Sequence, residues 1–537
     1  MGQIPVRLNT QGMAFPLLSD QSGRTVIDGR GDLTYVKGIS SDGDVPQDSG
    51  TPGAFYAHNI MPSTYGWQSV EFEQIIPPLS SGSAKFVDIN IVQGATVDPA
   101  TPGAKPVPSN FRTYIATVFD AGQTYLYFLN GSNTWQILTV EGAGTLVVVG
   151  EVRASVAQVN GISYILLPGA TSPFVLDVSA GVLLPRPFTG LIATDIQGII
   201  SSNGYIIVWT ATRVLWSSTI DVEDFVPSDV TDAGGGGVQE ASGAIIYCRP
   251  TTIGFLVFTD INCVSSVYTG NSKFPFEFKD ISSAGGVFNS SLVSKEDAAG
   301  YIYAYTTSGI QRIAHTGAAN VLTSITDFIS GRVFEDFDET TMSFSKVSLT
   351  TDMGRAIEVI SNRYVTVSYA QNTSGIYSHA IIVDAMQHRL GKIKLPHSAV
   401  FSYKKLVSNS IQDARSQIAF LQTNGAVQLL KFSINSSTAA GVLLFGKLQY
   451  MHQRMLQLQE VEVENADKFG NFSLYDFISY DGKTLMGPVE GYQDSSNLGR
   501  SLKIVNFSNV AKSHSLLMVG SFDILSLLIH VNVHGIA

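Results

Sequence analysis

The sequence predicts an all-β protein whose body is an irregular β-propeller of six or seven blades. Helical periodicity is nearly absent, and short runs rich in Val, Ile, Thr, Tyr and Phe recur between turns of Gly, Asn, Asp and Ser. Comparable strands recur on average every ~49 residues, within the roughly 40 to 50 residues of a four-stranded blade. A run of β-sandwich domains is the alternative, because both architectures bury alternate residues of every strand. The strand starts behind this spacing are Tyr125, Tyr164, Tyr205, Phe255, Tyr301, Tyr364 and Ile418.

Three segments pair two strands across a tight turn, which indicates one repeated unit. The first joins residues 125–129 to residues 134–138 through Asn130 and Gly131, the dipeptide most typical of a hairpin turn. The same order of strand, turn and strand occurs in residues 301–313 and 418–432.

Two regions depart from this rhythm, so we expect three parts. Residues 1–110 form an N-terminal loop-rich β region with contact arms, because residues 38–54 and 93–110 are long Gly, Pro, Ser and Asp stretches. Residues 111–440 form the propeller-like body. Residues 441–537 form a small C-terminal β domain, in which the alternating Glu and Val of residues 460–464 predict a strand with one solvent-facing side.

Composition excludes several classes of protein. Charged residues make up 14% of the 537 residues and the formal net charge is −11, which argues against a protein that binds nucleic acid by neutralising phosphates. Cys248 and Cys263, the two cysteines, are too few for a disulfide framework, and we expect buried free thiols. The N-terminus lacks the apolar core of a signal peptide, and we expect no membrane span.

The chemistry-bearing motifs predict no catalytic, cofactor or metal site. The DGKT sequence at residues 481–484 lacks the glycine that a phosphate loop needs at the position of Phe477, and the four glycines of residues 234–237 are expected to form a flexible loop. His530 and His534 share one face of a predicted strand, but solvent-facing histidines are a simpler interpretation than metal ligands.

One stretch of the sequence is strongly acidic, with Arg249 as the single cation between residues 221 and 260. A solubilising loop would explain this charge, and the functional alternative is a surface that repels phosphate and faces a channel. The candidate channel-facing residues are Asp221, Glu223, Asp224, Asp229, Asp232 and Glu240.

The central segment resembles the tail proteins of short-tailed bacteriophages. The residues that carry this resemblance are 208–228 (VWTATRVLWSSTIDVEDFVPS), 254–281, 300–313, 368–397 and 418–432, and residues 55–70 (FYAHNIMPSTYGWQSV) are also similar to virion proteins. The resemblance covers most of residues 200–485 and is one of strand and turn order rather than of a catalytic signature.

The resemblance implies a non-enzymatic tail nozzle or tail hub protein that contains a β-propeller. Such subunits form a ring, usually a homohexamer, below the portal and its head-to-tail adaptor protein, and the ring is a conduit and gate for genome exit. Tail fibres or spikes and a tail needle are further expected partners, duplex DNA passes without sequence-specific binding, and assembly takes place in the host cytoplasm. A sparse set of Lys and Arg side chains suits this passage, since each phosphate contact would add friction.

Two other functions remain open from the sequence. The long polar loops and 54 aromatic residues (29 Phe, 21 Tyr and 4 Trp) also suit a receptor- or glycan-binding virion protein. A polysaccharide depolymerase would use a pair of Asp or Glu side chains as acid and base.

Overall fold

The computed structural model describes 22 segments of the chain, and all structural statements below concern these residues. They are 3–9, 54–62, 67–79, 83–97, 104–177, 180–228, 230–315, 319–321, 334–338, 343–347, 355–361, 363–370, 376–384, 389–407, 410–411, 416–432, 441–445, 448–449, 455–465, 470–480, 486–493 and 502–533. Their regular structure is β-strand apart from two short 3-10 turns, η2 (Ala193–Asp195) and η3 (Ser290–Leu292). No helix in the described segments is long and apolar enough to cross a membrane.

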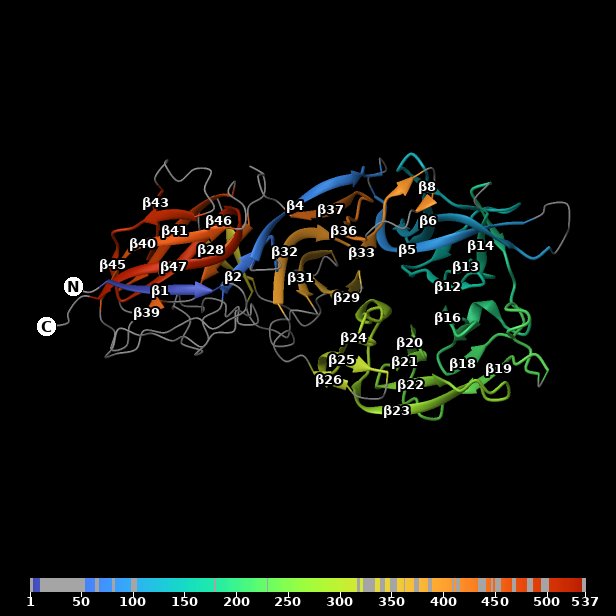
Figure 1. The fold of residues 1–537 in the computed structure, drawn as a ribbon. Coiled ribbons are helices and arrows are strands. Elements are labelled where there is room, and N and C mark those ends of the chain that lie inside the picture. The colour runs from blue at the N-terminus through green and yellow to red at the C-terminus, as the bar shows by residue number, and fades with distance from the viewer. Residues whose placement is uncertain are drawn as a thin grey trace.

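Seven antiparallel sheets follow one another as the blades of a propeller (Figure 1). From the innermost strand outward, blade 1 contains β5 (Lys85–Thr96), β6 (Val107–Asp120), β7 (Gln123–Leu129) and β8 (Trp135–Ile137), and blade 2 contains β12 (Ser155–Val159), β13 (Ile162–Leu166), β14 (Phe174–Asp177) and β15 (Val182–Pro185). Blade 3 contains β16 (Gly198–Ser202), β17 (Tyr205–Trp209), β18 (Arg213–Trp216) and β19 (Gly234–Gly237). Blade 4 contains β20 (Ile245–Thr251), β21 (Gly254–Thr259), β22 (Asn262–Tyr268) and β23 (Phe276–Gly285).

Blades 5 to 7 complete the circle. Their strands are β24 (Tyr301–Thr306), β25 (Gly309–Ala314) and β26 (Ala319–Val321); β29 (Arg355–Ile360), β30 (Tyr364–Tyr369), β31 (Tyr377–Asp384) and β32 (Arg389–His397); and β33 (Ala399–Tyr403), β36 (Gln417–Leu421), β37 (Val427–Phe432) and β4 (Trp67–Ile76). The predicted all-β propeller is therefore confirmed, and the strand pairing resolves the six or seven expected blades as seven.

A hydrophobic cluster fills every junction between neighbouring blades, which is why the ring closes. Alternate residues of each strand point to opposite faces, so every blade presents one apolar face to the blade before it and one to the blade after it. One pair of buried residues from each junction, in order from blades 1 and 2 to blades 7 and 1, is Val92 and Phe174, Tyr164 and Ile206, Trp209 and Val257, Phe258 and Ile302, Tyr303 and Val359, Ile382 and Phe420, and Val427 and Phe86.

The strand spacing found in the sequence agrees with the observed blades. Each of the seven strand starts used for the spacing falls in a different blade, from Tyr125 in blade 1 to Ile418 in blade 7. The three predicted hairpins are confirmed as the β7–β8, β24–β25 and β36–β37 pairs.

The N-terminal strand β4 is the outermost strand of the last blade. Its residues from Val70 to Ile76 pair antiparallel with β37, while Trp67 and Gln68 at its start pair with β47 (Asp523–Val533). Backbone and side-chain hydrogen bonds then join blade 7 to blade 1, including Trp135 Nε1–H to the Gly425 carbonyl at 2.8 Å. A strand that precedes the other propeller strands in the sequence thus completes the last blade and closes the ring.

The C-terminal strands form two sheets that pack face to face, and two N-terminal strands complete them. The first sheet contains β1 (Gln3–Asn9), β47, β40 (Leu456–Asn465), β44 (Leu502–Asn506), β43 (Tyr492–Gln493) and β45 (Val510–Ala511), and the second contains β2 (Ala54–His58), β38 (Gly441–Phe445), β46 (Ser513–Ser521), β41 (Asn471–Ser479), β42 (Met486–Glu490) and β39 (Leu448–Gln449). The predicted alternation in β40 is confirmed, since Leu456, Leu458, Val461 and Val463 are buried between the sheets.

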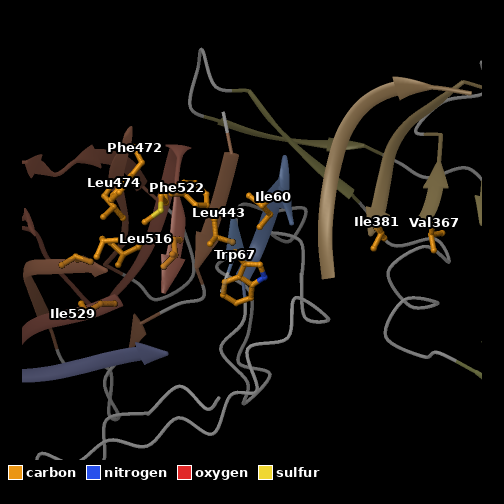
Figure 2. Close-up of a cluster of buried hydrophobic side chains, with 14 of the residues drawn as sticks. Ile60, Trp67, Val367, Ile381, Leu443, Phe472, Leu474, Leu516, Phe522 and Ile529 are labelled. Carbon is orange, nitrogen blue, oxygen red and sulfur yellow. The ribbon is translucent and has the colours of Figure 1, made fainter. Parts of the chain in front are cut away.

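One hydrophobic cluster continues from this sandwich into the propeller. Figure 2 shows Trp67 and Ile60 between the sandwich residues Leu443 and Phe522 and the blade 6 residue Ile381. Trp67 and Ile60 are 1% and 0% exposed, so β4 and the short strand β3 (Ile60–Pro62) form the seam between the two bodies.

The N-terminal strands are distributed over the whole molecule. The expected boundary near residue 110 lies inside β6, and β4 and β5 on its N-terminal side belong to blades 7 and 1. The expected boundary near residue 440 lies between β37, the last propeller strand in the chain, and β38, the first strand after it.

The expectation of a flexible loop at the four glycines is wrong. Gly234–Gly237 is β19, the edge strand of blade 3, and pairs with β18 from Arg213 to Trp216. A Cβ atom on Gly235 would lie 2.4 Å from the Val214 carbonyl oxygen, and one on Gly234 would lie 3.3 Å from the Trp216 ring. Close approach of the two strands therefore requires glycine at position 235 and favours it at position 234.

The junction that closes the ring can be tested at Gly425. Gly425 has a φ of +85°, and a Cβ atom there would lie 2.6 Å from the Phe86 ring of blade 1. Gly204, in the turn of blade 3, has a φ of +88° with no atom within 4 Å of the same position. We expect Gly204→Ala to lower the free energy of unfolding by about 1 kcal/mol and Gly425→Ala by about 2 to 3 kcal/mol, since only the latter adds overpacking to backbone strain. Urea denaturation measures the difference, and equal losses in both variants would contradict the closure contact.

Candidate functional site

The innermost strands of the blades surround a central cavity of about 880 Å³. Residues from all seven blades and from the segments that lead into them line it, which places it on the propeller axis. Cavities of roughly 300 to 1,000 Å³ with a few converging polar groups are the usual binding sites of small molecules. The cavity is therefore the first candidate site of the chain.

Seven charged residues line this cavity, and five of them come from five different blades. Asp88 lies on β5, Arg153 precedes β12, Arg249 lies on β20, Lys295 precedes β24 and Glu358 lies on β29. Glu358 is 3.6 Å from an Arg249 nitrogen and 3.7 Å from Lys295 Nζ, so both ion pairs are longer than a hydrogen bond. The charges come together because the inner strands, and the segments that lead into them, all line the axis.

Hydrogen bonds fix Arg249 within the site. Its Nε–H donates to the Ser294 carbonyl at 2.7 Å, and one of its terminal N–H groups donates to the Tyr247 hydroxyl at 3.0 Å. The Arg249 side chain is 12% exposed, whereas the Lys295 side chain is 62% exposed. Arg249 is thus a positioned cation at the wall of the cavity, while Lys295 is a largely exposed one.

Burial shifts the titration of the groups that line the cavity. It raises the pKa of Asp88, although Arg153 and the Ile89 N–H oppose this shift. Burial also raises the pKa of Tyr247, so its hydroxyl keeps its proton at neutral pH. For Arg153, burial acts to lower the pKa, but the Asp88 charge and the Tyr377 hydroxyl outweigh it and raise the pKa.

The predicted acidic stretch lies away from this cavity, in the loop between β18 and β19 of blade 3 and beyond it. Glu223 accepts two hydrogen bonds from Arg186 of blade 2, at 2.7 and 2.6 Å, and one from the Tyr164 hydroxyl at 3.1 Å. Asp221 pairs with Lys105 at 3.0 Å. Glu223 is therefore a neutralised link between blades 2 and 3 rather than free negative charge.

The remaining acids of the stretch cap local turns or are exposed. Asp224 accepts from the Val226 N–H at 2.9 Å, and Asp232 accepts from the Thr219 hydroxyl at 3.1 Å, which joins the two ends of the loop. Glu240 is exposed, and Asp229 lies outside the described residues. Whether these acids face a channel in an assembly stays a prediction.

The structure also locates most of the other residues that the sequence analysis named. Cys248 and Cys263 are buried free thiols, as expected, and the strand register places them on opposite faces of blade 4. His530 pairs with Glu462, with Nε2 2.8 Å from the carboxylate oxygen, and Glu460 lies nearby. His534 and the DGKT sequence lie outside the described residues.

Sequence reasoning missed the charged cluster of the central cavity. Its signal is a charge in the interior of a largely apolar strand, as with Asp88 in KFVDINIVQ, Arg249 in IIYCRPT and Glu358 in RAIEVI. Charged residues are almost never buried without a partner, so three such strands at blade spacing indicate a common meeting point.

Blade 6 carries a second titratable group, made of buried histidines. His397 is held neutral: its Nδ1–H donates to the Leu395 carbonyl at 2.6 Å and its Nε2 accepts from the Ser368 hydroxyl at 2.7 Å. Burial lowers the pKa of His397 to about 4, against the effect of the Leu395 hydrogen bond. Burial also lowers the pKa of His379 well below its usual value, with Lys392 and other nearby cations acting in the same direction.

Comparisons with known proteins do not identify a family. No family model matches the sequence, and no curated protein matches it. Among solved structures, the chain is similar to the extracellular domain of the one component system BT4673 from B. thetaiotaomicron, at 11% identity over 81% of this chain and 67% of that chain, with a TM-score of 0.26. It is also similar to the N-terminal domain of Nup159 (8% identity, 66% and 97% coverage, TM-score 0.29) and to AztD from Citrobacter koseri (11%, 58% and 96%, 0.28). Similarities at these TM-scores carry no argument about function.

The role of Glu223 separates it from its acidic neighbours. The side chains of Arg186 and Glu223 are 13% and 16% exposed, whereas those of Lys105 and Asp221 are 66% and 42% exposed. We expect Glu223→Ala to lower the free energy of unfolding by about 3 kcal/mol, because it leaves a largely buried guanidinium unpaired. We expect Asp221→Ala to lower it by less than about 1 kcal/mol. The midpoints of urea unfolding measure both, and similar losses would contradict the link between blades 2 and 3.

The histidines of blade 6 predict acid-sensitive stability. An unfolded histidine takes up a proton at its ordinary pKa of 6.5, whereas folded His397 does so only near 4. Its contribution is therefore complete above pH 6.5 and is lost as the pH falls towards 4, by about 3 kcal/mol in total. We expect the slope of unfolding free energy against pH to be shallower in His397→Gln than in the unchanged chain. Identical slopes over this range would show that His397 is not held neutral by the fold.

Proposed function

We propose that the chain is a non-enzymatic structural subunit of a bacteriophage tail, which closes with copies of itself into a ring below the portal and adaptor. The observation that carries the proposal is the strand β4, which pairs with blade 7 at one end and with the C-terminal sandwich at the other. The propeller and the sandwich share a strand and a hydrophobic cluster and so form one rigid unit, which a conduit requires.

We place the path of the genome outside the propeller, because the central cavity is too small to hold DNA. Within this cavity of about 880 Å³, Glu358 lies 3.6 Å from Arg249 and 3.7 Å from Lys295. A cavity of this volume is too small for a DNA duplex to pass through. A passage for the genome must therefore be bounded by several copies in head-to-tail contact, and such heterologous contacts close into a ring when the rotation between copies closes.

The loop between β18 and β19 supports this proposal as a contact surface between copies. Its acids alternate with exposed apolar side chains, among them Ile220 at 74% and Val230 at 80% exposure. Apolar side chains surrounded by polar ones are typical of interface centres and rims. We place the acidic stretch at the contact between subunits, next to the channel that they enclose.

Ring assembly tests the proposal directly. We expect the purified chain to form rings, with six copies as the expected number, in native mass spectrometry and in negative-stain images with a central hole. We expect Ile220→Asp with Val230→Asp to abolish the rings while the chain stays folded by circular dichroism. Val149→Asp changes an equally exposed residue (82%) in β11 (Val148–Val149), outside this loop, and should keep them. A chain that remains a monomer at all concentrations would overturn the ring.

The two other functions predict different results with the same sample. A receptor-binding protein would bind carbohydrate on a glycan array without forming rings. A depolymerase would release reducing sugar from host polysaccharide, and replacement of one carboxylate would abolish that release. A particle map that places the chain as isolated knobs on the capsid would favour the receptor-binding function over the tail conduit.

A further inference from the structure

Two glutamates and a histidine meet in the C-terminal sandwich, where β40 and β47 pair side by side (Figure 1). Glu460 lies directly opposite His530, and Glu462 is the next residue on the same face of β40. His530 Nε2 is 2.8 Å from a Glu462 carboxylate oxygen and 3.7 Å from a Glu460 carboxylate oxygen. One nitrogen or oxygen atom from each of the three residues lies within 4.8 Å of the other two, and this is the one such group of possible metal ligands in the described segments.

A β-bulge in β40 brings both carboxylates to the face that points away from the sandwich core. The pairing with β47 shifts between Leu458 and Glu460, so Gln459 is an extra residue. In a regular strand, Glu460 and Glu462 would share the core face of Leu458, because every second residue lies on one face. Beyond the bulge, Val461 occupies the core face instead. The bulge therefore gives the histidine two carboxylate neighbours without burying either carboxylate in the core.

The charges of this group do not balance. Glu460, Glu462 and His530 have side chains that are 34%, 25% and 21% exposed, so all three are partly withdrawn from water. Within the described segments, His530 is the one basic side chain within 4 Å of either carboxylate. A histidine carries at most one positive charge, which leaves two neighbouring carboxylates with an excess of negative charge. A divalent cation between the three side chains would offset it.

We propose that Glu460, Glu462 and His530 bind a zinc ion that links β40 to β47. Zinc binds histidine nitrogen and carboxylate oxygen at about 2.0 to 2.2 Å, so a tetrahedral site holds its ligand atoms about 3.4 Å apart. The two distances from His530 Nε2, 2.8 and 3.7 Å, lie on either side of this spacing. The ion takes the place of the proton on Nε2, the neutral ring keeps its proton on Nδ1, and water completes the coordination.

The histidine makes zinc the expected ion rather than magnesium or calcium. Magnesium and calcium are bound almost entirely by oxygen atoms, whereas imidazole nitrogen suits zinc. The expected role of the ion is structural, since β47 also pairs with β1 and with the start of β4 at the seam to the propeller. The zinc site goes beyond the proposed ring and does not depend on it, so either proposal can fail alone.

Zinc binding to the full-length chain, freed of metal with a chelator, tests the site. We expect saturable binding of one zinc ion in calorimetry, with magnesium and calcium binding about tenfold more weakly or less. We also expect zinc to raise the midpoint of thermal unfolding, because an ion that binds only the folded chain stabilises it.

Variants of the ligands locate the binding. We expect His530→Gln and Glu460→Gln each to weaken zinc binding at least about tenfold, since loss of a ligand costs no less than loss of a group that supports one. Glu460 makes no hydrogen bond to His530, so Glu460→Gln keeps the contact between His530 and Glu462 and remains informative even where His530→Gln fails to fold. The matched control is Glu464→Gln, which removes the same charge two residues further along β40 and should change the affinity less than about threefold.

Three results would overturn the site. The first is no saturable binding of zinc at micromolar concentration. The second is binding of magnesium or calcium as tight as that of zinc, or an equal loss of affinity in Glu464→Gln, either of which would show general attraction of cations to an acidic strand. The third is zinc affinity that stays the same in Glu460→Gln and in every folded His530 variant.

Discussion

The pairing of β4 with β37 is the interaction on which the rest of the structure depends. Without it, blade 7 would lose its fourth strand, and blade 1 would lose the cluster contact that Ile76 of β4 provides. An open ring would leave the apolar faces of the blades at the break exposed to solvent. Because the start of β4 also pairs with β47, a single strand both closes the propeller and attaches the sandwich to it.

Closure also creates the electrostatics of the central cavity. Asp88 of blade 1, Arg249 of blade 4 and Glu358 of blade 6 line this one cavity although they lie far apart in the sequence. Charges in such an enclosed region interact more strongly than the same charges at the surface. The cavity is thus a product of the whole ring, and its chemistry belongs to no single blade.

Local sequence patterns predicted the strands, the hairpins and the blade spacing, because turns and alternation are determined by residues close in the chain. They did not predict β4 as part of blade 7, since its partner β37 is at the far end of the propeller sequence. The four glycines of β19 resembled a flexible loop because the reason for Gly234 and Gly235 is a neighbouring strand, where the Trp216 ring and the Val214 carbonyl lie close, and this neighbour cannot be read from local composition. The inner charges were missed for the same reason: Arg249 and Glu358 are isolated in sequence and meet only across the axis.

In a chain with few charges, where each charge is placed matters more than their sum. The excess of acids between residues 221 and 260 suggested a repelling surface, yet Glu223 is bound by Arg186 and Asp221 by Lys105. Asp384, fully buried in blade 6, is bound in the same way by Arg363. Several carboxylates therefore serve to join strands and blades, and the exposed part of the acidic loop is as much apolar as acidic. In the ring that we propose, a surface of that kind would suit specific association between subunits more than simple repulsion of DNA.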